Sequence, residues 1–262
     1  GIRARSPSRG LGDVYKRQAP VLGLARRLLR RLNTHHRDQR PGQPDLDARI
    51  ASYDLAARMQ LSATDALDLS QETAKTRELY GIDDAMTGPY ARRCLMARRL
   101  VERGVRFVQV FMNCTRSQNP WDHHGDIEGS LRHSCGETDQ PVGALLTDLK
   151  RRGLLDSTLV IWGGEFGRLP ISQLGGSAGR DHGANGFSIW MAGGGVRGGT
   201  THGATDEFGY HAVEDRVSVH DFHATVLHLL GLDHEALVYP HHGLDEKLTG
   251  VEPARVVREI IA

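Results

Sequence analysis

The chain has 262 residues, of which 39% are hydrophobic and 25% are charged, and its formal net charge at pH 7 is +1. These values are those of an ordinary globular domain with enough apolar material for a core. They do not indicate a nucleic-acid partner, which a strong excess of basic residues would favour. The sequence holds no apolar run of about 18 residues, so it predicts no transmembrane segment.

Residues 1–18 show no apolar periodicity and are rich in Gly, Ser, Pro and Arg. The stretch from Asp13 to Gln18, DVYKRQ, resembles the translation of a transposase sequencing adapter. We therefore expect residues 1–18 to be a non-native or disordered leader, and residues 19–262 to be the C-terminal portion of one domain. The sequence also lacks the charged start, apolar stretch and small-residue cleavage site of a signal peptide.

The next part of the chain is predicted to be helical. A basic, leucine-rich stretch at 20–33 and a second stretch at 45–60 are separated by a polar linker. The arginines around the leucines of 20–33 favour a solvated surface helix, and a helix on a membrane surface is the alternative. A third helix is predicted at 90–102, with Gly104 at its C-cap.

Apolar runs typical of buried strands follow at 105–112, 159–162 and 187–192. A helix over 139–153, with a proline in its first turn, is predicted between the first two runs. A strand, a helix and a strand in this order predict a βαβ unit with a right-handed crossover, and hence a parallel sheet. The prediction is completed by a short strand at 217–219, a helix at 221–230 and a helix at 253–261.

Three clusters near the ends of predicted strands hold carboxylates and imidazoles. They are Trp121-Asp122-His123-His124, Gly163-Gly164-Glu165-Phe166-Gly167-Arg168 and Gly179-Arg180-Asp181-His182-Gly183. In open α/β sheets ligands bind outside the carboxyl ends of the strands. The chain has 14 histidines, and imidazole is the commonest metal ligand in proteins. We therefore expect the three clusters to converge on one divalent-metal site.

The candidate metal ligands are Asp122, His124, Glu165, Asp181 and His182. His123 is an alternative to its neighbour His124. Imidazole and carboxylate ligands fit Zn, Mn or Fe, and Ca or Mg where carboxylates prevail. Arg168 is suited to holding an oxyanion through two parallel hydrogen bonds.

Each cluster also has a structural interpretation. Asp122 and Asp221 would cap helices, and Glu165 would pair with Arg168. The three cysteines are too far apart for a Cys-x-x-Cys site and are interpreted as buried or free thiols. The glycine run at 193–199 lacks the spacing of a phosphate-binding loop, which argues against a nucleotide-binding protein.

Six segments carry a resemblance to a known family: WDHH, LVIWGGEFGR, GRDH, FSIWMAGGGVRGG, GATDEFGY and VHDFHATVLHLLGLDH. The family they resemble is the domain of unknown function 1501 family, over roughly residues 45–262. The resemblance places the chain in the alkaline phosphatase and sulfatase superfamily. It implies a three-layer α/β/α sandwich with a mostly parallel sheet, lacking its N-terminal part, and metal ligands at the strand ends.

The resemblance also implies roles for particular residues. Asp122 and His124 match ligands of one metal in the superfamily, and His182 matches another ligand of that site. Glu165 and Phe166 stand where metal-dependent members have an Asp-His pair, so a complete second metal site is not implied. The superfamily's nucleophile belongs to the N-terminal part of the domain, so no nucleophile is assigned here.

The function implied is a metal-dependent, sulfatase- or phosphatase-like hydrolase that acts on phosphate or sulfate esters of small molecules or glycans. The chain would be an inactive fragment of that enzyme. Phe166 favours the alternative, a non-catalytic sulfatase-like binding or scaffold protein with a vestigial metal site. Members of the family often carry an export signal, so the resemblance implies a place in the periplasm or at the cell surface.

Overall fold

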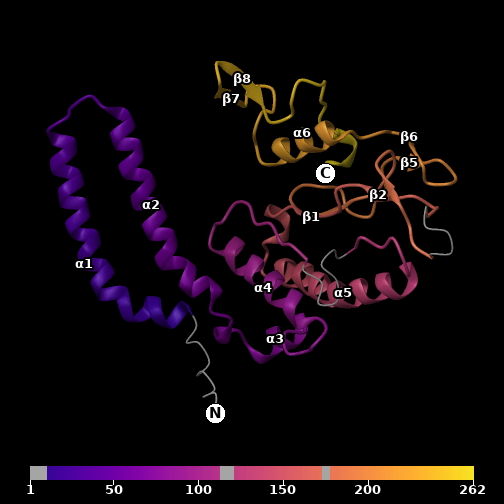
Figure 1. Cartoon of the computed structure of the whole chain (residues 1–262), viewed down its shortest axis with the longest axis horizontal. Helices are drawn as coiled ribbons and strands as arrows, with labels where there is room; N and C mark the ends of the chain where they lie inside the picture. Colours follow the sequence, from indigo (N-terminus) through magenta and orange to yellow (C-terminus); the bar gives the residue numbers. More distant parts are fainter. Residues whose placement is uncertain (1–10, 113–120, 173–177) are drawn as a thin grey trace, which may run out of the picture. The chain divides into compact units, whose positions relative to one another are not determined.

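The computed structural model describes residues 11–112, 121–172 and 178–262 (Figure 1). The chain divides into two compact units, Gly1–Thr73 and Ala74–Ala262, and each is described by itself. Over the described residues, no helix combines the length and the apolar character needed to cross a membrane.

The first unit is a helical hairpin. Helix α1 (Leu11–Asp38) contacts helix α2 (Pro44–Leu67), and Arg30 Nε lies 3.1 Å from Asp54 Oδ2 across the pair. The short 3-10 helix η1 (Leu69–Gln71) follows. Both long helices cover the segments predicted to be helical and extend beyond them at each end.

Three helices of the second unit pack against one another (Figure 1). They are α3 (Ala74–Tyr80), α4 (Gly88–Glu102) and α5 (Ile127–Arg151). The buried apolar side chains that they contribute are Tyr80, Tyr90, Ala91, Cys94, Leu95, Ala97, Ala144 and Leu149.

Helix α4 confirms the predicted helix at 90–102. Helix α5 begins well before residue 139, because Asp126 caps it by accepting a hydrogen bond from Gly129 N, and Pro141 lies within it.

One ionic cluster is buried among these helices. The Arg98 side chain is 2% exposed, with Nε 2.9 Å from Asp148 Oδ2 and Nη1 2.7 Å from Glu102 Oε2. Arg152 connects the same two carboxylates, at 2.8 Å from each. Tyr80 of α3 donates its hydroxyl proton to Asp148 Oδ2 at 3.2 Å. Asp148 therefore links α3, α4 and α5 at a place where an unpaired charge is costly.

The two described cysteines of this unit, Cys94 and Cys135, differ in exposure, and we expect them to differ in reactivity. Cys94 is 1% exposed, and burial raises the pKa of its thiol to about 12, whereas Cys135 is exposed on α5. Since the thiolate is the nucleophile, iodoacetamide at pH 8 should modify Cys135 in the folded protein and Cys94 only after unfolding. Peptide mapping by mass spectrometry measures both. Equal rates for the two in the native protein would contradict the described burial of Cys94.

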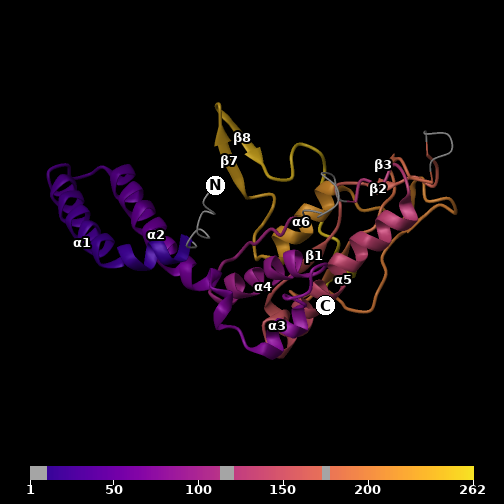
Figure 2. The same ribbon diagram turned by 60° about the horizontal axis from the view of Figure 1, so that its bottom comes forward.

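Among the described residues of the second unit, the strands form short antiparallel pairs and no parallel sheet. The pairs are β1 (Val160–Trp162) with β4 (Trp190–Ala192), β2 (Gly167–Arg168) with β3 (His182–Gly183), β5 (Ala204–Thr205) with β6 (Ala212–Glu214), and β7 (Val238–His241) with β8 (Leu244–Lys247). The prediction of a three-layer α/β/α sandwich with a mostly parallel sheet is therefore wrong. Figure 2 shows β2 beside β3 and the β7–β8 hairpin.

The error has a physical cause. Apolar runs identify segments suited to strands, but they specify neither the partner nor its direction. Residues 105–112 form no strand, and the side chains of Phe107 and Phe111 are 73% and 64% exposed where a central strand would bury them. The runs at 159–162 and 187–192 do contain strands, yet β1 and β4 pair antiparallel, with Ile161 opposite Met191. The predicted βαβ unit is thus absent from the described residues.

The C-terminal part corrects two further predictions. No strand forms at 217–219: residues 217 and 218 have no regular structure, and helix α6 (Val219–Leu229) begins at the next residue and covers most of the helix predicted at 221–230. Its capping box joins Ser218 and Asp221, which bears out the capping interpretation of Asp221. Beyond it, residues 253–261 contain only the 3-10 helix η3 (Arg258–Ile260) in place of a longer helix.

Candidate metal centre

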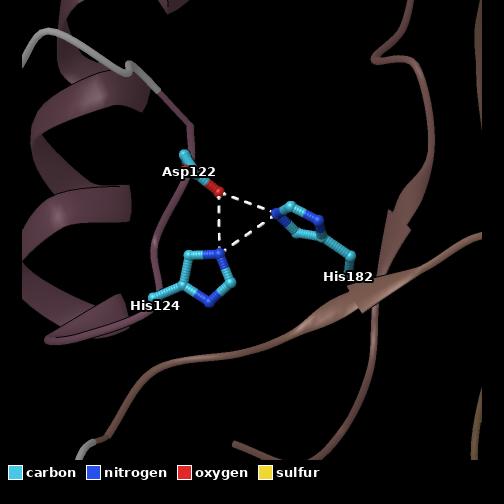
Figure 3. A group of neighbouring side chains, drawn as sticks. All are labelled: Asp122, His124 and His182. Atoms are coloured by element: carbon cyan, nitrogen blue, oxygen red, sulfur yellow. Dashed lines mark hydrogen bonds and ion pairs between the residues drawn. The ribbon is translucent and has the colours of Figure 1, made fainter.

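Asp122, His124 and His182 bring their side chains together at one point of the second unit (Figure 3). Asp122 Oδ1 lies 3.0 Å from His182 Nε2 and 3.1 Å from His124 Nε2. The two imidazole nitrogens lie 3.1 Å apart. One carboxylate oxygen and two ring nitrogens thus form a nearly equilateral triangle, which we call the Asp-His-His triangle.

Two chain segments far apart in the sequence build this triangle by running against each other. Arg180 N donates to His123 O at 2.9 Å, and Ile127 N donates to Ala178 O at 3.1 Å. Gly179 lies at the closest approach, where a Cβ atom would collide with the backbone carbonyl of His124. A glycine is therefore required for the segment that carries His182 to come this near.

The backbone around Asp122 and His124 adopts uncommon conformations. Trp121 has φ 71° and Asp126, the N-cap of α5, has φ 45°. For residues other than glycine, this left-handed region costs roughly 1 kcal/mol or more. Such conformations are held where the surrounding structure requires them, and here they bracket the loop that presents Asp122 and His124.

Asp181 stands behind one of the imidazoles. Its side chain is 10% exposed, and Oδ1 lies 3.3 Å from His124 Nδ1. A proton on Nδ1 allows His124 to donate to this carboxylate, and Nε2 then directs a lone pair into the triangle. The structure thus places Asp181 as the group that orients His124, next to the triangle and not at one of its corners.

The hydrogen bond to Asp181 determines what His124 presents to the triangle. With Nδ1 protonated, His124 Nε2 is an acceptor that faces the acceptor Asp122 Oδ1 at 3.1 Å. Asp122 Oδ1 also accepts from Arg168 Nη2 at 2.7 Å and lies 3.0 Å from His182 Nε2. A cation at the centre of the triangle would be ligated by all three atoms, with Arg168 as a competing partner of Asp122.

Asp122 is ionised at neutral pH. The hydrogen bond from His182 lowers the pKa of its carboxyl to about 2, with a further contribution from Arg168, whose Nη2 lies 2.7 Å from Asp122 Oδ1. Side-chain exposure is 31% for Asp122, 39% for His124 and 48% for His182, so solvent and solutes reach the triangle.

The residues of the β2–β3 pair extend the site beyond the triangle. Arg168 of β2 pairs directly with His182 of β3, so the two side chains lie on one face of the ladder. Phe166 packs its ring against the His182 ring, with 4.3 Å between centroids, and Arg168 Cζ lies 6.0 Å from the Phe166 centroid. Phe166 therefore fixes the plane of His182, a role that the resemblance did not suggest.

Two other predicted ligands lie outside the triangle. Glu165 is exposed in the bend before β2 and does not belong to the group of three. His123 turns toward α5, where its Nε2 lies 3.4 Å from Ser134 Oγ, and burial lowers the pKa of its imidazole. Of the two neighbouring histidines, the structure brings His124 and not His123 to the candidate ligand position.

Comparison with protein families decides the family of the chain. A model described as "Protein of unknown function (DUF1501)" matches residues 14–261. The chain belongs to the DUF1501 family. No curated protein and no solved structure matches it. The family named by resemblance is thus confirmed, and its description assigns no activity to DUF1501 proteins.

The three tryptophans of this DUF1501 chain form one series of ring contacts. Trp121, the neighbour of Asp122, meets the edge of Trp162 of β1 at 5.6 Å between centroids. Trp162 stacks on Trp190 of β4 at 6.3 Å. Sequence reasoning did not group these residues, because β1 and β4 bring them together only by pairing. Their fluorescence reports on this part of the molecule.

Proposed function

We propose that Asp122, His124 and His182 bind a divalent metal ion, with which this DUF1501 protein hydrolyses a phosphate or sulfate ester. The observation that supports the metal is the triangle itself. An ion about 2 Å from each of three ligand atoms requires those atoms to lie roughly 3–3.5 Å apart. The three separations are 3.0, 3.1 and 3.1 Å, so the three ligand side chains themselves need little rearrangement to hold an ion.

The surroundings of the triangle favour the same proposal. Histidines that bind metals usually donate their second ring N–H to a carboxylate or a carbonyl, which fixes the tautomer, and Asp181 is placed to accept from His124 in this way. Two imidazoles and one carboxylate suit Zn or Mn, and also Fe, better than Ca or Mg, which prefer oxygen ligands alone. The exposure of the triangle leaves coordination positions for water and substrate.

Each residue of the site has a task in this proposal. A bound divalent ion would polarise the ester oxygen and lower the pKa of an attacking water. Arg168 provides guanidinium donors for non-bridging oxygens of the ester. Asp181 holds the His124 tautomer, and Phe166 holds the ring of His182. The proposal that the substrates are phosphate or sulfate esters of small molecules or glycans rests on the resemblance to sulfatase-like enzymes. On the same resemblance we propose that the protein is exported to the periplasm or the cell surface.

The test is titration of the purified chain with Zn²⁺ or Mn²⁺, because the resemblance assigns no nucleophile to it and ester hydrolysis is not expected of the chain alone. Binding in a 1:1 ratio that a chelator reverses would support the proposal, and absence of binding would overturn it. Hydrolysis of p-nitrophenyl phosphate or p-nitrophenyl sulfate by the parent enzyme, dependent on the same ion, separates the hydrolase from the second candidate, a non-catalytic binding or scaffold protein. The contact between Phe166 and His182 favours that candidate, because a phenyl ring cannot complete a second metal site.

Gly179 offers a test of the triangle that changes none of its ligands. In Gly179→Ala the new methyl group meets the backbone carbonyl of His124. The two segments must then separate, and we expect metal affinity to fall by about tenfold or more, the range seen when groups that orient ligands are lost. Titration with Zn²⁺, followed by tryptophan fluorescence or calorimetry, measures the change.

The matched control is Gly198→Ala, because a Cβ at Gly198 meets nothing within 4 Å. This variant should bind metal like the parent chain. Unchanged affinity in Gly179→Ala would show that the approach of the two segments does not create the site.

A further inference from the structure

Arg168 donates a hydrogen bond to Asp122 Oδ1, the same carboxylate oxygen that the metal ion would bind. Its Nη2 lies 2.7 Å from Asp122 Oδ1, closer than either imidazole nitrogen of the triangle. The second terminal nitrogen, Nη1, makes only a 3.5 Å contact with Arg180 O. One carboxylate oxygen therefore faces a guanidinium and two imidazoles at once, and the guanidinium is its nearest neighbour.

We propose that a divalent ion displaces Arg168 from Asp122 Oδ1, and that the freed guanidinium then binds a tetrahedral oxyanion, phosphate or sulfate, together with the ion. The inference rests on the proposed metal site and deepens it, because it makes cation and oxyanion binding cooperative. Arg168 has two partners in turn: Asp122 before the metal binds, and the oxyanion afterwards.

Electrostatics supplies the reason for the exchange. With the ion bound, the guanidinium and the divalent cation would share one carboxylate oxygen, and like charges so close repel each other. An oxyanion between them turns this repulsion into two attractions, since it ligates the ion with one oxygen and accepts from the guanidinium with others. The planar fork of arginine presents paired donors that match such an anion.

The position of Arg168 allows the exchange without movement of the backbone. It lies opposite His182 in the β2–β3 pair, so its side chain starts on the same face as a metal ligand. Its side chain is 24% exposed, which leaves the solvent side of the guanidinium open to an incoming anion. Phe166 flanks both Arg168 and His182 and provides a flat surface along which the guanidinium can turn.

Two measurable consequences follow. Because coupling between two ligands is reciprocal, phosphate should tighten metal binding by the same factor by which metal tightens phosphate binding. In the absence of anions, Arg168→Gln should bind metal more tightly than the parent chain, since the competing guanidinium is gone. In the presence of phosphate the order should reverse, because the variant lacks the donor that holds the anion.

The experiment is calorimetric titration of the full chain with Mn²⁺, with inorganic phosphate, and with each in the presence of the other. Sulfate replaces phosphate in a parallel series, which decides between the two oxyanions. We expect metal to tighten phosphate binding about tenfold or more in the parent chain and about twofold or less in Arg168→Gln. Arg216→Gln, which removes the same charge from an exposed loop position, should behave like the parent chain.

The outcomes separate this inference from the proposed function. If Mn²⁺ does not bind the parent chain, the metal site itself is wrong. If Mn²⁺ binds but phosphate and sulfate affinities are the same with and without it, the coupling is wrong and the metal site stands. Weaker metal binding by Arg168→Gln without anions would also overturn the inference, since Arg168 would then position Asp122 and not compete for it.

Arg168→Lys keeps the charge and loses the planar fork of donors, so this variant should retain part of the coupling. Near-ultraviolet circular dichroism checks that each variant is folded.

Discussion

Replacing Asp148 by alanine is expected to lower the free energy of unfolding by about 3–5 kcal/mol. Asp148 carries the only carboxylate that contacts all of Arg98, Arg152 and Tyr80 among the described residues. Arg98 is 2% exposed and keeps its charge when the carboxylate is removed. The guanidinium keeps its contact with Glu102, whose side chain is 35% exposed, but loses the buried carboxylate that offsets its desolvation. Denaturation in urea, followed by circular dichroism at 222 nm, measures the loss.

The control for this prediction is Asp139→Ala on the same helix. Asp139 is exposed, so its removal should change the free energy of unfolding by no more than about 0.5 kcal/mol. Tyr80→Phe should fall between the two, at about 1 kcal/mol, because it removes one hydrogen bond and leaves the ion pairs intact. A similar, small loss for Asp148→Ala and Asp139→Ala would mean that the ionic cluster does not link the three helices.

This cluster also shows which part of the fold can be predicted from sequence. The apolar spacing of α4 predicts its inward face, and Gly104 marks its end with φ 85°. The spacing of hydrophobic residues does not reveal that Arg98 belongs to the inward face, because a charged residue is expected to be solvated. Only its carboxylate partners, one of them 50 residues away on α5, make burial of Arg98 possible.

For the strands, the apolar pattern predicts which segments are strands but not how those strands pair. The runs that contain β1 and β4 are apolar enough to be strands, but a sheet also requires neighbours, and pairing is set by contacts between distant residues. The connection between β1 and β4 contains the β2–β3 ladder, and it returns the chain antiparallel. Helix α6 was predictable because its Ser218–Asp221 capping box and apolar spacing are local.

The sequence predicts the chemistry of the candidate site better than it predicts which residues are the metal ligands. Short-range patterns singled out Asp122, His124 and His182, and the structure brings these three together. The same patterns gave Glu165 and Asp181 equal weight, although one is exposed and the other stands behind His124. Sequence alone does not separate a ligand from a residue that orients a ligand, because both are carboxylates near a histidine.

Replacing His182 by alanine is expected to lower metal affinity by more than about 100-fold, because loss of an orienting group alone costs about 10–100-fold. The variant keeps Asp122 and His124, but two ligands leave the ion mostly solvated and remove the third corner of the triangle. Metal content after dialysis, measured by inductively coupled plasma mass spectrometry, and titration with Zn²⁺ give the two readouts.

Two companion variants turn this prediction into a graded series. Asp181→Asn keeps the shape of the side chain but weakens its hold on His124 Nδ1, and should cost about 10–100-fold in affinity. His228→Ala removes an exposed imidazole from α6 and should leave metal binding unchanged. Equal losses for His182→Ala and His228→Ala would contradict the assignment of the triangle. A loss in Asp181→Asn as large as in His182→Ala would instead place Asp181 among the ligands, with four protein groups around the ion.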